Sequence, residues 1–277
     1  MTAYLRPGTL NEALDALGHG MRLLAGGTDL YPATQNASLA GEVVDLTCLP
    51  EMRGISKTSA GLRIGACTTW TDIMRADLPS ALHALQQAAA EVGGKQIQNA
   101  GTLGGNLCNA SPAADGVPPL LAVDAKVELA SPRGSRLLAL GDFLLGPRKT
   151  ARLPDEILTA ILIPQASLSG QSHFIKLGAR AYLVISIAMV ATRITAENGR
   201  IASAALAVGA CSATAQRIGL AEAALIGQPL ASASLDTAAV SAALSPVDDL
   251  RATADYRIQA ATELLRRAIT QTCKAMA

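Results

Sequence analysis

Residues 101–115 read Gly-Thr-Leu-Gly-Gly-Asn-Leu-Cys-Asn-Ala-Ser-Pro-Ala-Ala-Asp, and this stretch decides the fold more than any other part of the chain. Its glycine pair, Gly104-Gly105, is flanked by a hydroxyl and an amide. Because glycine has no Cβ, the backbone can come close to a ligand and point consecutive N–H groups at one spot. Such a concavity suits a phosphate group.

A second segment repeats this pattern nearer the N-terminus. It reads Leu23-Leu24-Ala25-Gly26-Gly27-Thr28-Asp29-Leu30, an apolar run interrupted by two glycines and followed by a hydroxyl and an acid. Two loops of this kind predict two walls that clamp one extended anionic ligand. A dinucleotide has that shape.

The composition describes a globular chain with room for two domains. Of the 277 residues, 50% are apolar and 16% are charged, and the formal net charge is +1. No basic cluster is present, so we expect no nucleic-acid binding. The longest apolar runs fall short of the ~20 residues that span a bilayer, so no membrane insertion is expected.

The five cysteines are scattered along the chain, without a C-x-x-C pair or a nearby histidine pair. This pattern disfavours a zinc site or an iron–sulfur cluster held by this chain, and it fits a reducing compartment. The N-terminal residues 1–7 also lack the apolar core of a signal peptide. We therefore expect a cytoplasmic protein without metal ligands.

Acid–base and nucleophilic machinery is missing from the sequence. There is no Gly-x-Gly-x-x-Gly dinucleotide fingerprint, no P-loop and no Gly-x-Ser-x-Gly elbow. The three histidines are isolated, and a lone histidine is more often structural than catalytic. A chain rich in ligand-binding backbone and poor in reactive side chains is typical of proteins whose cofactor does the chemistry, so we expect no catalytic residue.

The rest of the pattern alternates short strands and helices. A capping-box signal at Thr9 predicts a helix over 10–17, and further helices are expected over 71–75 and 79–92. Strands are expected over 22–25, 43–46, 62–65, 125–130, 136–140 and 156–163. A polar linker over 165–172 marks a domain boundary. Beyond it we expect strands over 173–177, 182–194 and 201–209 and an amphipathic helix over 258–273.

These motifs together resemble the FAD-binding medium subunit of the molybdenum hydroxylase family, which includes xanthine dehydrogenase and carbon monoxide dehydrogenase. The likeness rests on Ala25–Asp29, on Gly101–Asn106 and on Ser111-Pro112-x-x-Asp115. Weaker matches in the same order are Arg148–Thr150, Pro154–Leu158, Phe174-x-Lys176 and Ala254–Arg257. The likeness extends over essentially the whole chain.

The resemblance implies an α+β fold in two domains. Residues 1–165 would form a two-part FAD-binding domain of the vanillyl-alcohol-oxidase/PCMH type, with subdomains of about 1–54 and 55–165. Residues 173–277 would form a smaller C-terminal α/β domain of the carbon monoxide dehydrogenase flavoprotein type, with an antiparallel sheet and a helix bundle. The chain would carry FAD. A small partner would carry [2Fe-2S] clusters and a large one molybdopterin, in a dimer of heterotrimers.

The resemblance also implies the cofactor-binding residues. From the two segments they are Leu23, Leu24, Ala25, Gly26, Gly27, Thr28, Asp29, Leu30, Ala100, Gly101, Thr102, Gly104, Gly105 and Asn106. Asp115 would bond sugar or ribityl hydroxyls, and Leu158, Lys176 and Tyr182 would lie beside the cofactor. Because these loops hold few cations, N–H groups, hydroxyls and Asn106 would have to bind the diphosphate.

One departure from the family concerns the electron acceptor. Tyr182 and Leu183 stand where eukaryotic xanthine dehydrogenases carry an acid-containing loop over the flavin, which argues against NAD as the acceptor. An equally good reading is that Tyr182 begins a buried strand. Two other functions stay open: a self-contained flavin oxidase of the same superfold, and a non-catalytic assembly protein that has lost the cofactor.

Overall fold

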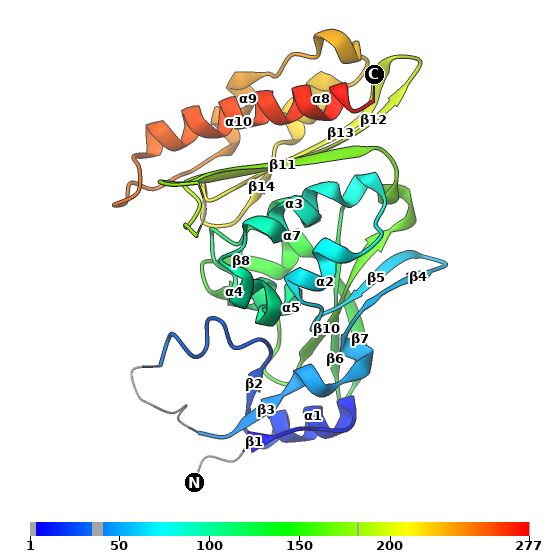
Figure 1. Ribbon diagram of the computed structural model, residues 1–277, viewed down its shortest axis with the longest axis vertical. Helices are drawn as coiled ribbons and strands as arrows, with labels where there is room; N and C mark the ends of the chain where they lie inside the picture. Colours follow the sequence, from blue (N-terminus) through cyan, green and yellow to red (C-terminus); the bar gives the residue numbers. More distant parts are fainter. Residues whose placement is uncertain (1–3, 35–40, 182, 277) are drawn as a thin grey trace.

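Three main sheets follow one another along the long axis of the molecule (Figure 1). The computed structural model describes residues 4–34, 41–181 and 183–276. Its N-terminal end is a small parallel sheet of order β1-β3-β2, formed by β1 (Tyr4–Leu5), β2 (Arg22–Leu24) and β3 (Val43–Asp45). The helix α1 (Leu10–Gly18) joins β1 to β2, and the Thr9 hydroxyl caps it by accepting the Glu12 N–H at 3.2 Å.

The middle of the molecule is an antiparallel sheet of order β4-β5-β10-β6-β7. Its strands are β4 (Ile55–Thr58), β5 (Gly61–Gly65), β6 (Lys126–Ser131), β7 (Gly134–Ala139) and β10 (Ile157–Pro164). The helices around it are α2 (Trp70–Arg75), α3 (His83–Glu91), α4 (Lys95–Ala100), α5 (Leu103–Asn109), α6 (Val117–Ala122) and α7 (Leu140–Phe143). A two-stranded ribbon, β8 (Leu144–Gly146) and β9 (Lys149–Thr150), follows α7.

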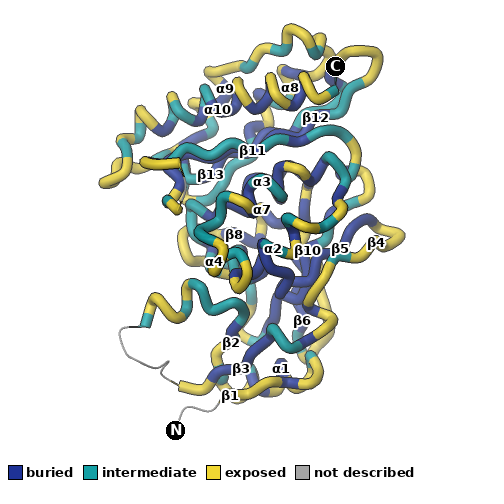
Figure 2. Tube along the Cα trace, in the orientation of Figure 1, coloured by how far each residue is buried: buried dark blue, intermediate teal, exposed yellow. Residues whose placement is uncertain are grey.

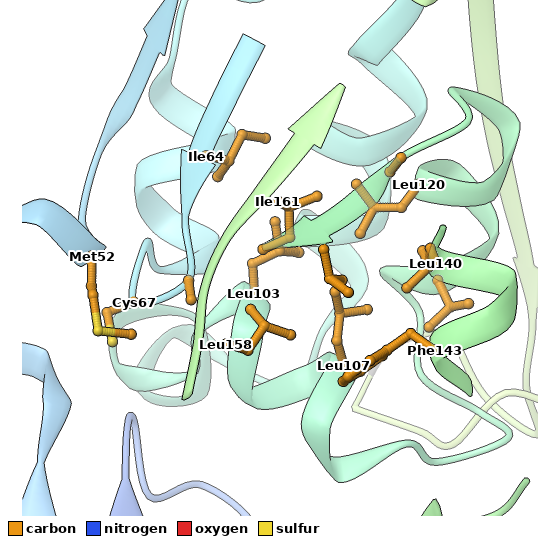
Figure 3. Close-up of a cluster of buried hydrophobic side chains, with 14 of the residues drawn as sticks. Met52, Ile64, Cys67, Leu103, Leu107, Leu120, Leu140, Phe143, Leu158 and Ile161 are labelled. Atoms are coloured by element: carbon orange, nitrogen blue, oxygen red, sulfur yellow. The ribbon is translucent and has the colours of Figure 1, made fainter. Parts of the chain in front are cut away.

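The core of this middle part lies between the central strand β10 and the helix α5. Leu103 and Leu107 on α5 and Ile161 on β10 are fully buried in one apolar cluster (Figure 3). Phe143 closes the cluster at the α7 end. Burial of this kind contributes about 1.5–3 kcal/mol for each large apolar side chain, so it holds α5 firmly against the sheet.

The C-terminal part is an antiparallel sheet of order β11-β12-β13-β14 with helices on both faces. Its strands are β11 (Gln171–Leu177), β12 (Ala188–Glu197), β13 (Arg200–Gly209) and β14 (Gln216–Arg217). The helices α8 (Gly219–Leu225), α9 (Thr237–Ala243) and α10 (Ala254–Lys274) cover the outer face (Figure 1).

The inner face of this sheet packs on α3 and α6 of the middle part. Since side chains alternate along a strand, Val190 faces α10 whereas Met189 and Ala191 face the middle domain. Both faces are therefore covered, and Figure 2 shows β12 and β13 as mostly buried. The two domains share a continuous apolar junction around Phe174, Ala84 and Ala88.

The outermost strand of the C-terminal sheet, β11, has its free edge occupied by α3. The Gln87 side chain accepts the Phe174 N–H at 2.8 Å and places its amide nitrogen 3.2 Å from His173 Nδ1. The Ser172 hydroxyl in turn accepts the Ala84 N–H at 2.9 Å. The Gln87 side chain thus satisfies the Phe174 N–H, a bond that a neighbouring strand would otherwise make.

Two expectations from the sequence are wrong. The strand expected from residue 182 begins only at Ala188, because Leu183 has a left-handed backbone (φ +56°) and Ser186 bonds away from the sheet. The glycine-rich segment expected as a loop contains a helix, α5, whose first N–H groups bond to other parts of the chain. The segment expected as a linker, 165–172, does lie between the two main sheets: it contains a short 3-10 turn (Gln165–Leu168), and its last two residues begin β11.

The boundaries at residues 54 and 165 stay proposals. They are supported by the change from the parallel sheet to the antiparallel one between Asp45 and Ile55, and by the end of β10 at Pro164. Across the described ranges, no helix combines the length and apolar character needed to cross a bilayer.

Candidate functional site

A cleft of about 1080 Å³ lies where the two glycine-rich segments meet. One wall is the segment Leu23–Leu30, which begins in β2, and the other is the N-terminal half of α5 with Gly101 and Thr102. The C-terminal domain closes the cleft with Lys176 and residues 183–185. Elements far apart in the sequence therefore form one cavity.

The structure brings most of the predicted site residues to this cleft. The cleft is lined by Leu23, Leu24, Ala25, Gly26, Gly27, Thr28, Asp29, Leu30, Gly101, Thr102, Gly104, Gly105, Asn106, Asp115, Leu158 and Lys176. Ala100 does not line it; its carbonyl instead packs against Gly26. Tyr182 lies outside the described residues. Contact with a cofactor stays a prediction for each of them.

The two walls touch directly at Gly26. A Cβ on this residue would stand 1.9 Å from the carbonyl oxygen of Ala100 and 2.9 Å from the Cα of Gly101. Both are backbone atoms that cannot rotate away. Glycine is therefore required here for the two segments to come together.

The neighbouring glycines of α5 face different surroundings. A Cβ on Gly104 would meet Ala66 at 2.6 Å in the core, whereas one on Gly105 would meet only the Thr102 hydroxyl at 2.8 Å and Ala25 at 3.9 Å. Gly104 thus lets α5 pack on the strand β5 side, and Gly105 leaves the gap between the walls open.

The N–H groups of α5 are not free to bind a phosphate, contrary to the expectation from the sequence. Leu103 donates to Thr68, Gly104 to Ala66 and Gly105 to the Thr102 hydroxyl, at 2.8 to 3.1 Å. Asn106 donates its N–H to the Thr102 carbonyl at 3.0 Å. The second segment therefore offers side chains to a ligand, and its backbone serves the fold.

The first segment has the opposite character. Its positive-φ residue Gly27 (φ +70°) turns the chain. The Gly27 and Asp29 carbonyls accept the N–H groups of Tyr31 and Ala33, each four residues further along. Within the described ranges, no protein acceptor is recorded for the N–H groups of residues 26–30. These residues line the cleft, so unpaired N–H groups among them can donate to phosphate oxygens.

One buried polar atom in the cleft has no partner. The side-chain oxygen of Asn106 is buried, yet no hydrogen-bond donor within the described chain reaches it. Leaving such an acceptor unpaired costs about 1–3 kcal/mol. The oxygen faces Gly116, where a Cβ would come within 3.1 Å of it, so a ligand in the cleft would pair with it only after the side chain turns. A flavin dinucleotide suits this cleft, since it carries a diphosphate for the first wall and polar ring and sugar groups for the side chains of Thr102 and Asn106 on the second.

Arg148 and Arg152 line the cleft, although the sequence argument had left them without a role. Arg148 has a left-handed backbone (φ +60°), donates from its side chain to Asn109 and approaches the Asp29 carboxylate at 3.9 Å. Arg152 lines the same side. Arg148 lies between the two strands of the β8–β9 ribbon and Arg152 follows it, and the quoted motif Arg148–Thr150 contains only the first of them. Cations are therefore available to an anionic ligand.

Asp115 and Lys176 form a buried ion pair at the domain junction. Lys176 Nζ lies 2.6 Å from one carboxylate oxygen of Asp115, and the Ser186 hydroxyl donates to the other at 2.6 Å. Burial raises the pKa of Asp115, and the Lys176 ammonium and the Ser186 hydroxyl oppose that rise. Both carboxylate oxygens thus already accept a hydrogen bond from the protein. A sugar or ribityl hydroxyl of a ligand would add a further bond to one of them.

Metal ligation finds no support in the described chain, where no three histidine, cysteine or carboxylate side chains converge. The fold and the site define a class: a two-domain protein whose N-terminal domain holds a dinucleotide cleft between its two glycine-rich segments, closed by the C-terminal domain, with no reactive side chain assigned to it.

Comparisons with known proteins agree with this class and narrow it. Residues 1–166 match the model of the FAD binding domain in molybdopterin dehydrogenase, and residues 173–272 match the carbon monoxide dehydrogenase flavoprotein C-terminal domain. This chain belongs to that family of FAD-binding subunits and is an oxidoreductase subunit.

Individual relatives align along nearly their full length. A xanthine dehydrogenase FAD-binding subunit of Escherichia coli is 34% identical, over 97% of this chain and 95% of the relative. A carbon monoxide dehydrogenase medium chain of Afipia carboxidovorans is 31% identical, over 96% and 94%. Among solved structures, a reconstituted CO dehydrogenase from Oligotropha carboxidovorans superimposes with a TM-score of 0.91 at 29% identity, covering 100% of this chain and 99% of that one.

Proposed function

We propose that this chain is the electron-transfer subunit of a multi-subunit molybdenum hydroxylase. It would hold FAD in the cleft and pass electrons from [2Fe-2S] clusters on a small partner to an external acceptor, while a large molybdopterin subunit oxidises the organic substrate. The two relatives reported above, a xanthine dehydrogenase FAD-binding subunit and a carbon monoxide dehydrogenase medium chain, support this reading. A dimer of heterotrimers in the cytoplasm is the corresponding assembly, and the free cysteines fit a reducing compartment.

The observation that carries the proposal is the pairing of unlike walls in one cleft. The free N–H groups of residues 26–30 suit the diphosphate, and Arg148 adds positive charge beside them. Asn106 and Asp115 also line the cleft, and Asp115 lies where the C-terminal domain closes it. Bound FAD would supply the redox chemistry, and these residues would bind and orient it.

Cys108 provides a direct test of where the cofactor binds. Its side chain lines the cleft and is exposed to water, although desolvation between the walls raises the pKa of its thiol to about 11. We expect slow alkylation of Cys108 in cofactor-free protein, since little thiolate is present near pH 8. FAD at about 100 times its Kd should slow this reaction about a hundredfold, because only the open fraction reacts.

Mass spectrometry of tryptic peptides measures the labelling, and the buried thiols Cys67 and Cys211 are internal controls. Equal labelling of Cys108 with and without bound FAD would place the cofactor elsewhere. A chain that binds no flavin at all would support the assembly-protein function.

Dependence on partners is a second expected result. The FAD-loaded chain alone should be reduced by dithionite but not by purines, aldehydes or N-heterocycles, because no substrate-activating group lies in the described part of the cleft. Anaerobic bleaching of the flavin absorption band measures this. Reduction of the pure chain by any such substrate would support the flavin oxidase instead.

A further inference from the structure

The segment Ser111–Asp115, which follows α5, is fastened to the C-terminal domain at three points. Pro112 accepts the Ala210 N–H at 2.9 Å. Asp115 accepts from Lys176 and from Ser186, each at 2.6 Å. Since all three donors belong to the C-terminal domain, that domain fixes one end of the cofactor cleft.

A buried arginine of α10 supports the backbone at two of these contacts, beside Ser186 and at Ala210. Arg257, only 4% exposed, donates to the carbonyl of Ile187 at 2.6 Å and to that of Ala210 at 2.9 Å. It also pairs with the Asp249 carboxylate at 2.7 Å. The backbone beside Ser186 is thereby held at a defined place, as the Ile187 N–H also bonds the Leu177 carbonyl at 2.8 Å.

Ser186 lies between the fixed backbone of Ile187 and the residues of the cleft wall that precede it. The preceding residues Leu183, Val184 and Ile185 line the cleft. Leu183 is 49% and Ile185 53% exposed, so two large apolar side chains stand in water at the cavity. Their exposure is relieved if a flat apolar ligand packs against them.

We propose that Ser186 is a positioning residue of the cleft: by donating to Asp115 it sets the wall Leu183–Ile185 against the bound flavin. Nothing in the pattern of the sequence marks this serine, and it acts through Asp115 rather than by touching a reacting atom. The inference rests on the proposed function, because it assigns a wall of the same FAD site.

The test is Ser186→Ala, which removes one hydroxyl and leaves the Asp115–Lys176 pair in place. In cofactor-free protein, amide hydrogen exchange of residues 183–187 should become about tenfold faster, the effect of losing one hydrogen bond to a charged group, while β10 exchanges as before. The Kd for FAD should rise about tenfold for the same reason. Ser169→Ala is the matched control, since its exposed hydroxyl bonds only the nearby Ala166 carbonyl.

The two measurements separate the possible failures. Exchange like that of the parent, or faster exchange with unchanged FAD affinity, overturns the positioning role. Faster exchange throughout the chain also overturns it, since this shows a general loss of stability. If the parent binds no FAD, the proposed function fails, and the positioning role toward flavin fails with it even where the exchange result stands.

Discussion

Gly26→Ala is expected to lower FAD affinity about a hundredfold, equivalent to about 2.8 kcal/mol. The added Cβ would stand 1.9 Å from the Ala100 oxygen, and real Cβ atoms keep at least 3.0 Å from such neighbours. The two walls of the cleft must therefore part by about 1 Å, which also destabilises the fold by about 1–3 kcal/mol. Flavin fluorescence titration and thermal unfolding of the cofactor-free protein measure the two effects.

Gly141→Ala is the matched control for this prediction. Gly141 lies on α7, has no close neighbour within 4 Å of an added Cβ and has no left-handed backbone. The Gly141→Ala variant should therefore bind FAD as tightly as the parent protein does. If Gly26→Ala also retains parental affinity, the close contact between the walls does not shape the cofactor site.

Asp115→Ala should cause the largest loss of stability, about 3–5 kcal/mol, because it leaves a buried ammonium without its counter-charge. The Lys176 side chain is 6% exposed, and its other acceptor is the Glu91 carbonyl at 3.3 Å. Urea unfolding of the cofactor-free chain measures this free energy.

The double variant Asp115→Ala, Lys176→Met separates charge burial from cofactor binding. Removing both charges should restore much of the unfolding free energy, since a buried pair is often no more stabilising than apolar groups. FAD affinity should be lower than that of the parent in both the single and the double variant, because the Ser186 hydroxyl lacks its acceptor in each. A double variant as unstable as Asp115→Ala would show that the cost does not come from the unpaired lysine.

The elements with strong local signals were predictable from the sequence. The helix α1 has its Thr9 cap, and the strands β6 and β7 have the expected alternation around a tight turn. The resemblance also placed Gly26, Asn106 and Lys176, residues from three separate segments, in one site, and the structure brings them to one cleft.

The errors arose where distant contacts overrule local preference. A segment with Gly104-Gly105 is a poor helix former, yet α5 forms because Leu103 and Gly104 donate to the backbone after β5. The apolar residues 183–187 look like a strand, but fastenings to Asp115 and Arg257 hold them out of the sheet. Arg148 reaches the cleft only through the β8–β9 ribbon, which no local pattern indicates.

The covering of β11 by Gln87 has a consequence for biosynthesis. An outermost strand with unsatisfied N–H groups can pair with another copy during folding and lead to aggregation. Here α3 precedes β11 in the chain, so a ribosome completes the helix and its Gln87 side chain before the strand emerges. The nascent C-terminal sheet thus meets an intramolecular partner for its edge as soon as that edge exists.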